Sequence, residues 1–190
     1  MIRSLAALVC VALSVSACAA SHQTARGDGA PPWSSLTSPT AALNVALSEV
    51  CLPAMMEGRP IGEVAEARYL VPVAPRSTGS SQAVAAWRLA SWHNVHVMQL
   101  PNGGCSVSLE AGNAEDLAAA AVEMIRASGP FVAGQMVPAR SGEAENAAWC
   151  TPGERPMVAG VLKKLSGRGP ALVVNVFRAE ASRPSFCSAG

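Results

Sequence analysis

Apolar residues recur along the first half of the chain with the spacing of helix faces. Leu43, Leu47 and Val50 are separated by four and three residues, which places them on one side of a helix. Ser38-Pro39 is a typical helix start, because serine can cap the first turn and proline tolerates the first helical position. The pattern therefore predicts a buried helix that begins near residue 38.

A proline and a loop signal follow this helix. Pro53 is expected to end or kink it, because proline lacks a backbone donor and clashes with the preceding turn. Residues 61–68 predict a second short helix with Ile61, Val64 and Ala65 facing inward. Residues 72–81 contain prolines, serines and a glycine and are expected to form a loop.

A longer helix is predicted in the middle of the chain. Asn113 is a typical N-cap, and Glu115 and Asp116 suit the positive end of the helix dipole. Gly129-Pro130 is expected to stop the helix. Its expected inward positions are Leu117, Ala121, Met124 and Ile125.

Period-two alternation predicts a hairpin between residues 95–100 and 105–109. Asn102-Gly103 lies between the two runs, and an Asn-Gly turn of this kind has positive φ at both positions. Three residues of the second strand are expected to face the core: Cys105, Val107 and Leu109.

Further strands are predicted on both sides of the hairpin, at 87–89, 131–137, 147–150, 157–165 and 171–177. Residues 172–177 are apolar on both faces for half their length, which is typical of a central strand. The order of elements predicts an α+β fold, in which a mainly antiparallel β-sheet packs against two or three helices. No repeat of fixed period is visible.

The N-terminus has the pattern of an export signal. Arg3 precedes an uncharged, largely apolar run at 5–17, which is 13 residues long. A membrane-spanning helix needs about 20 apolar residues, so this run is better explained as a secretory signal peptide.

The end of this run, Val15-Ser16-Ala17-Cys18, resembles the lipobox of bacterial lipoproteins. The resemblance implies cleavage before Cys18, lipidation of its sulfur and a membrane anchor. Ala19, in place of an aspartate, implies sorting to the outer membrane. Ordinary secretion, with cleavage after Ala19 or Ala20, is the alternative.

The expected organisation is a signal peptide at 1–17, a lipidated Cys18 with a flexible tether through 38, and one domain at 39–190. The tether is expected because 19–38 is rich in Ser, Gly, Pro and Ala and lacks apolar periodicity.

Four cysteines lie beyond the tether, and an even number in an exported domain predicts two disulfides. Three pairings are possible, and the sequence alone does not choose among them. We favour Cys51–Cys105, which would join the first helix to the hairpin, and Cys150–Cys187, which would fix the C-terminal segment. No C-x-x-C motif is present, so a thioredoxin-type site is not expected.

Composition and charge exclude several classes of protein. Half of the 190 residues are apolar and 14% are charged, which excludes a disordered chain. Removal of Arg3 with the signal leaves 13 basic and 13 acidic residues, so a nucleic-acid partner is not expected.

Candidate chemistry is limited to one aromatic and histidine segment, whose pocket candidates are Trp92, His93 and His96. In a strand, residues three apart face opposite sides, so the two histidines are not expected to share a metal ion. We expect the two histidines to lie in a strand at the edge of the sheet, with one face exposed to solvent. Motifs for nucleotide binding, zinc hydrolysis or a serine nucleophile are absent, and no cofactor is expected.

Other charged residues are expected to be solvated. Glu143 and Glu145 fall in a predicted loop, and Lys163-Lys164 is expected to blunt a sheet edge. The arginines weighed as contacts for an anionic ligand are Arg88, Arg140 and Arg178.

These features favour a non-catalytic lipoprotein of the cell envelope, anchored in the membrane through its lipid, with a binding or assembly role. Its partner would be an envelope protein or a small molecule. The alternatives are a soluble secreted binding protein and an exported enzyme that acts on envelope substrates through a histidine-containing site.

Overall fold

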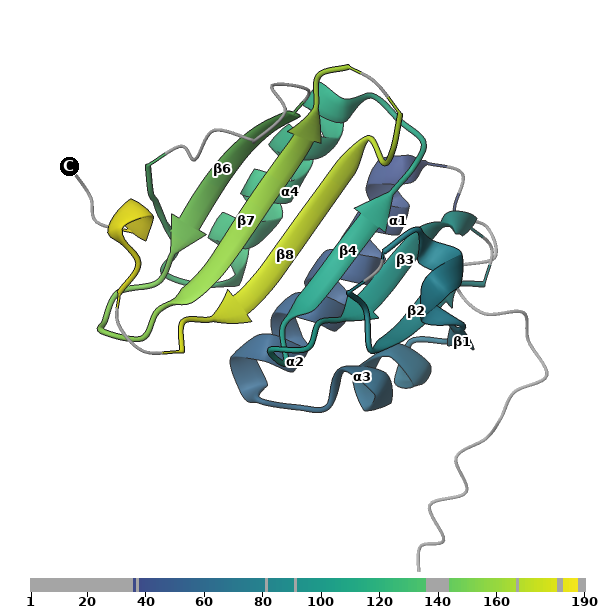
Figure 1. Ribbon diagram of the computed structural model, residues 1–190, viewed down its shortest axis with the longest axis horizontal. Helices are drawn as coiled ribbons and strands as arrows, with labels where there is room; N and C mark the ends of the chain where they lie inside the picture. Colours follow the sequence, from purple (N-terminus) through teal and green to yellow (C-terminus); the bar gives the residue numbers. More distant parts are fainter. Residues whose placement is uncertain are drawn as a thin grey trace, which may run out of the picture.

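The computed structural model describes residues 36, 38–80, 82–90, 92–135, 144–166, 168–180 and 183–187. Within them, eight strands form one antiparallel sheet in the order β1-β2-β3-β4-β8-β7-β6-β5, and helices cover one of its faces (Figure 1). The expected signal peptide, Cys18, Arg140 and Glu143 lie outside the described residues. The fold is α+β, as the sequence predicts.

The strands are β1 (Leu70–Val73), β2 (Ala85–Leu89), β3 (Trp92–Gln99), β4 (Cys105–Leu109), β5 (Val132–Ala133), β6 (Ala144–Cys150), β7 (Met157–Lys164) and β8 (Leu172–Arg178). The helical segments are α1 (Pro39–Asn44), η2 (Val45–Cys51), α2 (Leu52–Glu57), α3 (Ile61–Ala67), η3 (Pro75–Thr78), α4 (Ala114–Ser128) and η4 (Ser185–Cys187).

The first helix continues through the proline that was expected to end or kink it. Segments α1, η2 and α2 are continuous, and η2 is π-helical, with the Leu52 N–H donating to the Leu47 carbonyl five residues back. A proline ring clashes with the carbonyl four residues earlier in a regular α-helix, and the wider turn before Pro53 accommodates it. Ser38 occupies the N-cap as predicted, but its side chain makes no cap hydrogen bond.

The middle helix follows its sequence signals closely. The Asn113 side-chain oxygen accepts hydrogen bonds from the backbone N–H groups of Glu115 (2.9 Å) and Asp116 (3.2 Å). These bonds satisfy two of the donors that the first turn of α4 leaves free. Three of the four expected inward residues are buried: Leu117, Ala121 and Ile125.

The hairpin of β3 and β4 is confirmed, but its turn differs from the predicted one. Only Gly103 has positive φ, at 75°, whereas Asn102 does not. Because proline fixes φ near −65°, Pro101 favours a type I turn, and Gly103 then supplies the left-handed residue of a three-residue loop. The Asn102 side chain accepts a hydrogen bond from the Gly104 N–H at 3.0 Å.

Part of the predicted loop 72–81 is a strand. Pro72 lies in β1, where it pairs with Trp87 of β2. Strand β1 is at the edge of the sheet, and an edge strand tolerates a residue without a backbone donor. The prolines of this segment therefore predicted a loop where the chain forms a strand, because this strand depends on pairing with β2 and not on its local sequence.

The chain repeats one topology twice, although its sequence shows no repeat. Helix α1-η2-α2 precedes strands β1 to β4, and helix α4 precedes strands β5 to β8. The two sets of strands join through β4 and β8, which pair antiparallel at the centre of the sheet. This strand order relates the two halves by an approximate two-fold axis normal to the sheet, so both helices lie on the same face.

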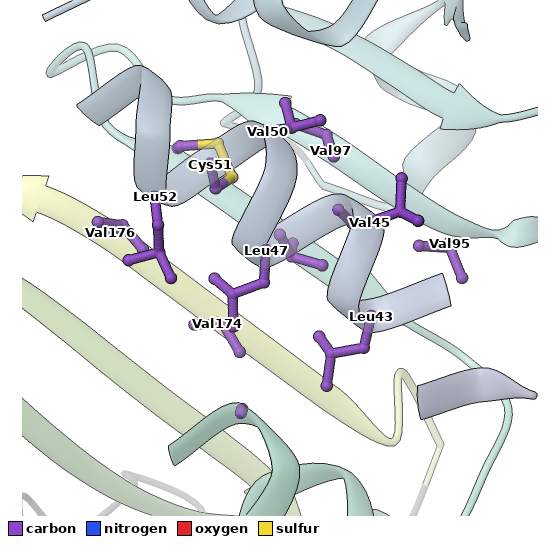
Figure 2. Close-up of a cluster of buried hydrophobic side chains, with 14 of the residues drawn as sticks. Leu43, Val45, Leu47, Val50, Cys51, Leu52, Val95, Val97, Val174 and Val176 are labelled. Atoms are coloured by element: carbon purple, nitrogen blue, oxygen red, sulfur yellow. A yellow bond between two sulfur atoms is a disulfide. The ribbon is translucent and has the colours of Figure 1, made fainter. Parts of the chain in front are cut away.

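The main core lies between this helical layer and the sheet. Leu47 and Leu52 extend from the first helix toward Val174 and Val176 of β8, and Leu43 belongs to the same core one turn earlier in the helix (Figure 2). All five side chains are buried, and burial of a side chain of this size contributes about 1.5–3 kcal/mol. Strand β8 is central, as predicted, because it lies between β4 and β7.

Both favoured disulfides are present, one on each face of the sheet. Cys51–Cys105 joins η2 to β4 within the helix-facing core (Figure 2). Cys150–Cys187 joins β6 to η4 and packs with Val158, beside Phe177 and Phe186, on the opposite side. Disulfides persist in oxidising compartments, so the pair is consistent with a location outside the cytoplasm.

Within the described ranges, one helical stretch, Pro39–Glu57, has the length and apolar composition needed to cross a membrane. Half of its most apolar window is buried against the rest of the fold. Its packing on β3, β4 and β8 accounts for this composition as that of a core helix.

Candidate functional site

The face of the sheet opposite the helices, here called the open face, carries the buried polar side chains. Alternation along β4 turns Ser106 and Ser108 to the open face, while Cys105, Val107 and Leu109 enter the core. Among the described residues, four polar side chains are buried: Thr78 (8% exposed), His96 (6%), Ser106 (2%) and Ser108 (5%). Ser106, Ser108 and His96 lie on this face, and Thr78 belongs to the segment above it.

Three of these side chains, Thr78, Ser106 and Ser108, line a groove of about 780 Å³ that follows the β4–β8 seam. Its floor is formed by β3, β4 and β8, and its walls by residues 78–80, Gln82 and residues 169–170. The described lining residues are Thr78, Gly79, Ser80, Gln82, Met98, Leu100, Ser106, Ser108, Glu110, Gly169, Pro170, Val173 and Asn175. The groove therefore joins three segments that are distant in sequence.

The groove is lined mainly by neutral hydrogen-bonding groups. Hydroxyls come from Thr78 and three serines, and amides come from Gln82 and Asn175. Met98, Leu100, Pro170 and Val173 add apolar surface. Among its lining residues in the described part of the chain, Glu110 alone carries a formal charge. This lining suits a ligand that is polar but uncharged where it lies in the groove and that also has some apolar surface.

One wall is held by local hydrogen bonds. The Thr78 hydroxyl donates to the Pro75 carbonyl at 2.7 Å and lies 3.3 Å from the Ser80 backbone N–H, which donates to it. Gly79 has φ of 70°, a left-handed conformation that suits glycine. This part of the wall is thus a hydrogen-bonded turn that follows the short helix η3.

His96 lies beneath one side of this region, in a row that crosses three strands. Strand register places Arg88 opposite His96 and His96 opposite Ser108. Burial lowers the pKa of His96 below its usual value; the charge of Glu110 opposes this shift, and the charge of Arg88 adds to it. Within the described residues, His96 Nδ1 and Arg88 Nε are buried without a hydrogen-bond partner.

The expectation of edge histidines is wrong for His96. Strand β3 is interior, with β2 and β4 on its two sides, and the His96 side chain is buried. Trp92 and His93 also belong to β3, but their side chains lie outside the described residues. The structure therefore places one of the three pocket candidates, beside the groove.

Two other predictions about charged residues are corrected. Glu145 lies in β6, not in a loop, and forms an ion pair with Lys163 at 2.9 Å. Lys163 also pairs with Glu115 of α4, and β7 is an interior strand, so this lysine does not blunt an edge. Both carboxylates hydrogen-bond Lys163 and raise its pKa. Arg178 is exposed at the end of β8.

In the described part of the chain, no group of three or more His, Cys, Asp or Glu side chains is arranged to hold a metal ion. The groove residues were missed by sequence reasoning, although the alternation Ser106-Val107-Ser108 was visible. It predicts a polar face on β4, whereas the burial of that face depends on distant segments.

Comparisons of the chain with protein-family models, curated proteins and solved structures find no match.

Proposed function

We propose that the protein is an exported, lipid-anchored binding protein of the cell envelope, and that its groove holds a small polar ligand. The observation that carries the proposal is the gathering of buried polar side chains along one groove, while the other face of the sheet is packed by an apolar core. The Thr78 hydroxyl is hydrogen-bonded to the backbone, and the serine hydroxyls of the floor offer donors and acceptors to a ligand, which apolar side chains would not. A ligand-binding role accounts for the retention of these hydroxyls.

The size and lining of the groove support this proposal. Ligand sites commonly have volumes of about 300–1,000 Å³ and place a few polar groups among apolar ones. The groove, at about 780 Å³, falls within that range. The short side chains of Ser106 and Ser108 leave the space above the floor open to a ligand.

The location rests on the N-terminal sequence together with the disulfides. Lipidation of Cys18 would anchor the protein, and the tether would hold the groove away from the bilayer. The proposed location is the periplasmic face of the outer membrane. Loss of palmitate labelling in Cys18→Ser is the expected result, and persistent labelling would exclude Cys18 as the lipidated residue.

Ligand binding is tested by filling the groove. Purified protein is incubated with the low-molecular-mass fraction of an envelope extract, and retained compounds are identified by mass spectrometry after gel filtration. Asn175→Trp fills the floor, whereas Asn146→Trp adds the same bulk to the open face outside the groove. Wild type and Asn146→Trp should retain a common compound that Asn175→Trp loses. Equal retention by both variants, or none by wild type, would refute the groove as a binding site.

A hydrolytic function is a second candidate, favoured by the position of His96. Register sets Ser108 opposite His96, and the charge of Glu110 acts on the same ring. A lowered pKa keeps the imidazole neutral near pH 7, the form that accepts a proton as a general base. If the groove is catalytic, Ser108→Ala and His96→Gln should each abolish turnover of an envelope-derived ester or amide while retaining the fold.

A further inference from the structure

A small hollow adjoins the groove on the far side of β8. It has a volume of about 130 Å³ and shares Pro170 and Val173 with the groove. The side chains that distinguish it are Lys164, Ser166 and Arg168. Two cationic groups and a hydroxyl thus border a groove whose own lining is almost uncharged.

Lys164 is held in place by a backbone carbonyl, and among the described residues no carboxylate neutralises it. Its Nζ donates to the Gly169 carbonyl at 3.1 Å, which fixes the lysine against the loop that forms the groove wall. An ammonium has three donors, so two remain for a ligand. Within the described residues, no carboxylate lies at ion-pair distance from Lys164 or Arg168.

The neighbouring lysine shows the contrast. Lys163 points to the other face of the sheet, where Glu115 and Glu145 both pair with it. The hollow around Lys164 has no acidic residue among its lining in the described part of the chain. The charge of Lys163 is therefore compensated by two carboxylates of the fold, whereas the charges of Lys164 and Arg168 lie beside the groove.

We infer that this hollow is an anion subsite, and that the groove ligand has an uncharged polar body and carries one carboxylate or phosphate group. The inference rests on the proposed binding function. Ammonium and guanidinium groups form strong charge-assisted hydrogen bonds with such anions. The shared residues Pro170 and Val173 allow one molecule to occupy both spaces.

The position of Glu110 limits the ligand further. Glu110 follows β4 and Lys164 ends β7, so these opposite charges lie on the two sides of β8. A polyanion extended through the groove would bring negative charge to Glu110 and be repelled. The arrangement selects a ligand with one anionic end and an uncharged body, and it disfavours a polyanion such as nucleic acid.

The subsite is tested by NMR titration of the ¹⁵N-labelled mature chain with sodium acetate, inorganic phosphate and dimethyl phosphate, with sodium chloride as the ionic-strength control. Acetate or phosphate should give saturable shifts at the backbone amides of Ser166, Arg168 and Gly169. Dimethyl phosphate represents the phosphodiester of a lipid headgroup, and a response to it alone would overturn the inference in favour of a lipid surface.

Variants with the same change of charge provide the control. Lys164→Gln/Arg168→Gln should raise the apparent dissociation constant for the anion at least tenfold, whereas Arg126→Gln/Arg178→Gln should leave it unchanged. An absent response in wild type, or equal responses in both double variants, would overturn the inference.

The result also separates this inference from the binding function. Asn175→Trp should lose the retained compound but keep the anion response. A compound retained by wild type and lost in Asn175→Trp, without any anion response, would refute the subsite and leave the groove standing. Loss of both results in wild type would refute both.

Discussion

Ser106 and Asn175 are direct partners across the β4–β8 seam, where the two halves of the sheet meet. Both side chains line the groove, and both lie near the approximate two-fold axis of the fold. Their neighbours along the strands, Val107 and Val174, face the apolar core instead. The same pair of strands therefore holds the two halves together on one face and forms a polar floor on the other.

The two disulfides are expected to contribute substantially to the stability of the fold. They close loops with sequence separations of 54 and 37 residues, for which the chain-entropy relation gives about 4 kcal/mol each. Cys51→Ala/Cys105→Ala and Cys150→Ala/Cys187→Ala should each lower the free energy of unfolding by an amount of that order in urea denaturation. An unchanged midpoint in either double variant would contradict the estimate for that bridge.

Gly62 should not tolerate alanine, although alanine usually stabilises a helix by about 0.5–1 kcal/mol relative to glycine. A Cβ at this position would lie 2.9 Å from Cζ2 of Trp87, which is buried beneath α3. Overpacking of a core costs about 1–3 kcal/mol, so Gly62→Ala should be net destabilising in thermal or urea unfolding.

A double-mutant cycle identifies the cause. Trp87→Phe removes the ring atom that the new methyl would meet, so Gly62→Ala should cost less in that background. If the cost is the same in both backgrounds, contact with the Trp87 ring is not its origin.

Local sequence signals predicted the parts of the fold that short-range physics decides. Asn113 caps its helix because the amide reaches two nearby N–H groups, and the 95–109 hairpin follows from alternation around a tight turn. Both signals lie within the segments that they shape. The favoured disulfide pairing is also present: Cys51 and Cys105 were expected to be buried, and Cys150–Cys187 was expected to fix the C-terminal segment.

The groove could not be predicted in the same way, because its parts meet only through long-range pairing. Ser106 and Ser108 were assigned the polar side of a strand, but their burial depends on residues 78–80, Gln82 and residues 169–170. Pro72 concealed the edge strand β1, and β8 reaches β4 across the whole second half of the chain. Pairing between strands that are distant in the sequence produces no periodic pattern of residues.

The Lys163 ion pairs should stabilise the fold modestly and in a pH-dependent way. Glu145→Gln removes one partner at 2.9 Å, and an ion pair near the surface is worth about 0.2–1 kcal/mol. The pKa of Lys163 is raised, so the contribution is present below the unfolded value of 10.5 and is lost as pH rises through the higher folded value.

Urea unfolding of wild type and Glu145→Gln at pH 7 and pH 9 should therefore give similar differences, and the difference should shrink above pH 10.5. Glu123→Gln removes a carboxylate that pairs only with the exposed Arg126 among the described residues, and it should change the unfolding free energy less. A larger effect for Glu123→Gln would contradict the prediction that the ion pairs of Lys163 stabilise the fold more than this exposed pair does.

His96 should make the protein less stable under mildly acidic conditions. Burial lowers its pKa below 6.5 in the folded state, so the unfolded chain binds the proton more readily. Stability from neutral His96 is present above 6.5 and is lost as pH falls from that value through the folded pKa. The loss cannot exceed about 1.4 kcal/mol per pH unit for one group.

Unfolding free energies between pH 7.5 and pH 5 should fall less steeply in His96→Gln than in wild type, because glutamine does not titrate. Glu110→Gln removes the charge that opposes the shift, so an NMR titration of the His96 ring should give a still lower pKa in that variant. A raised pKa in wild type would instead mean that a negative charge dominates the site, and the burial argument would be wrong. The direction of this shift also bears on the hydrolytic alternative, which requires His96 to remain neutral.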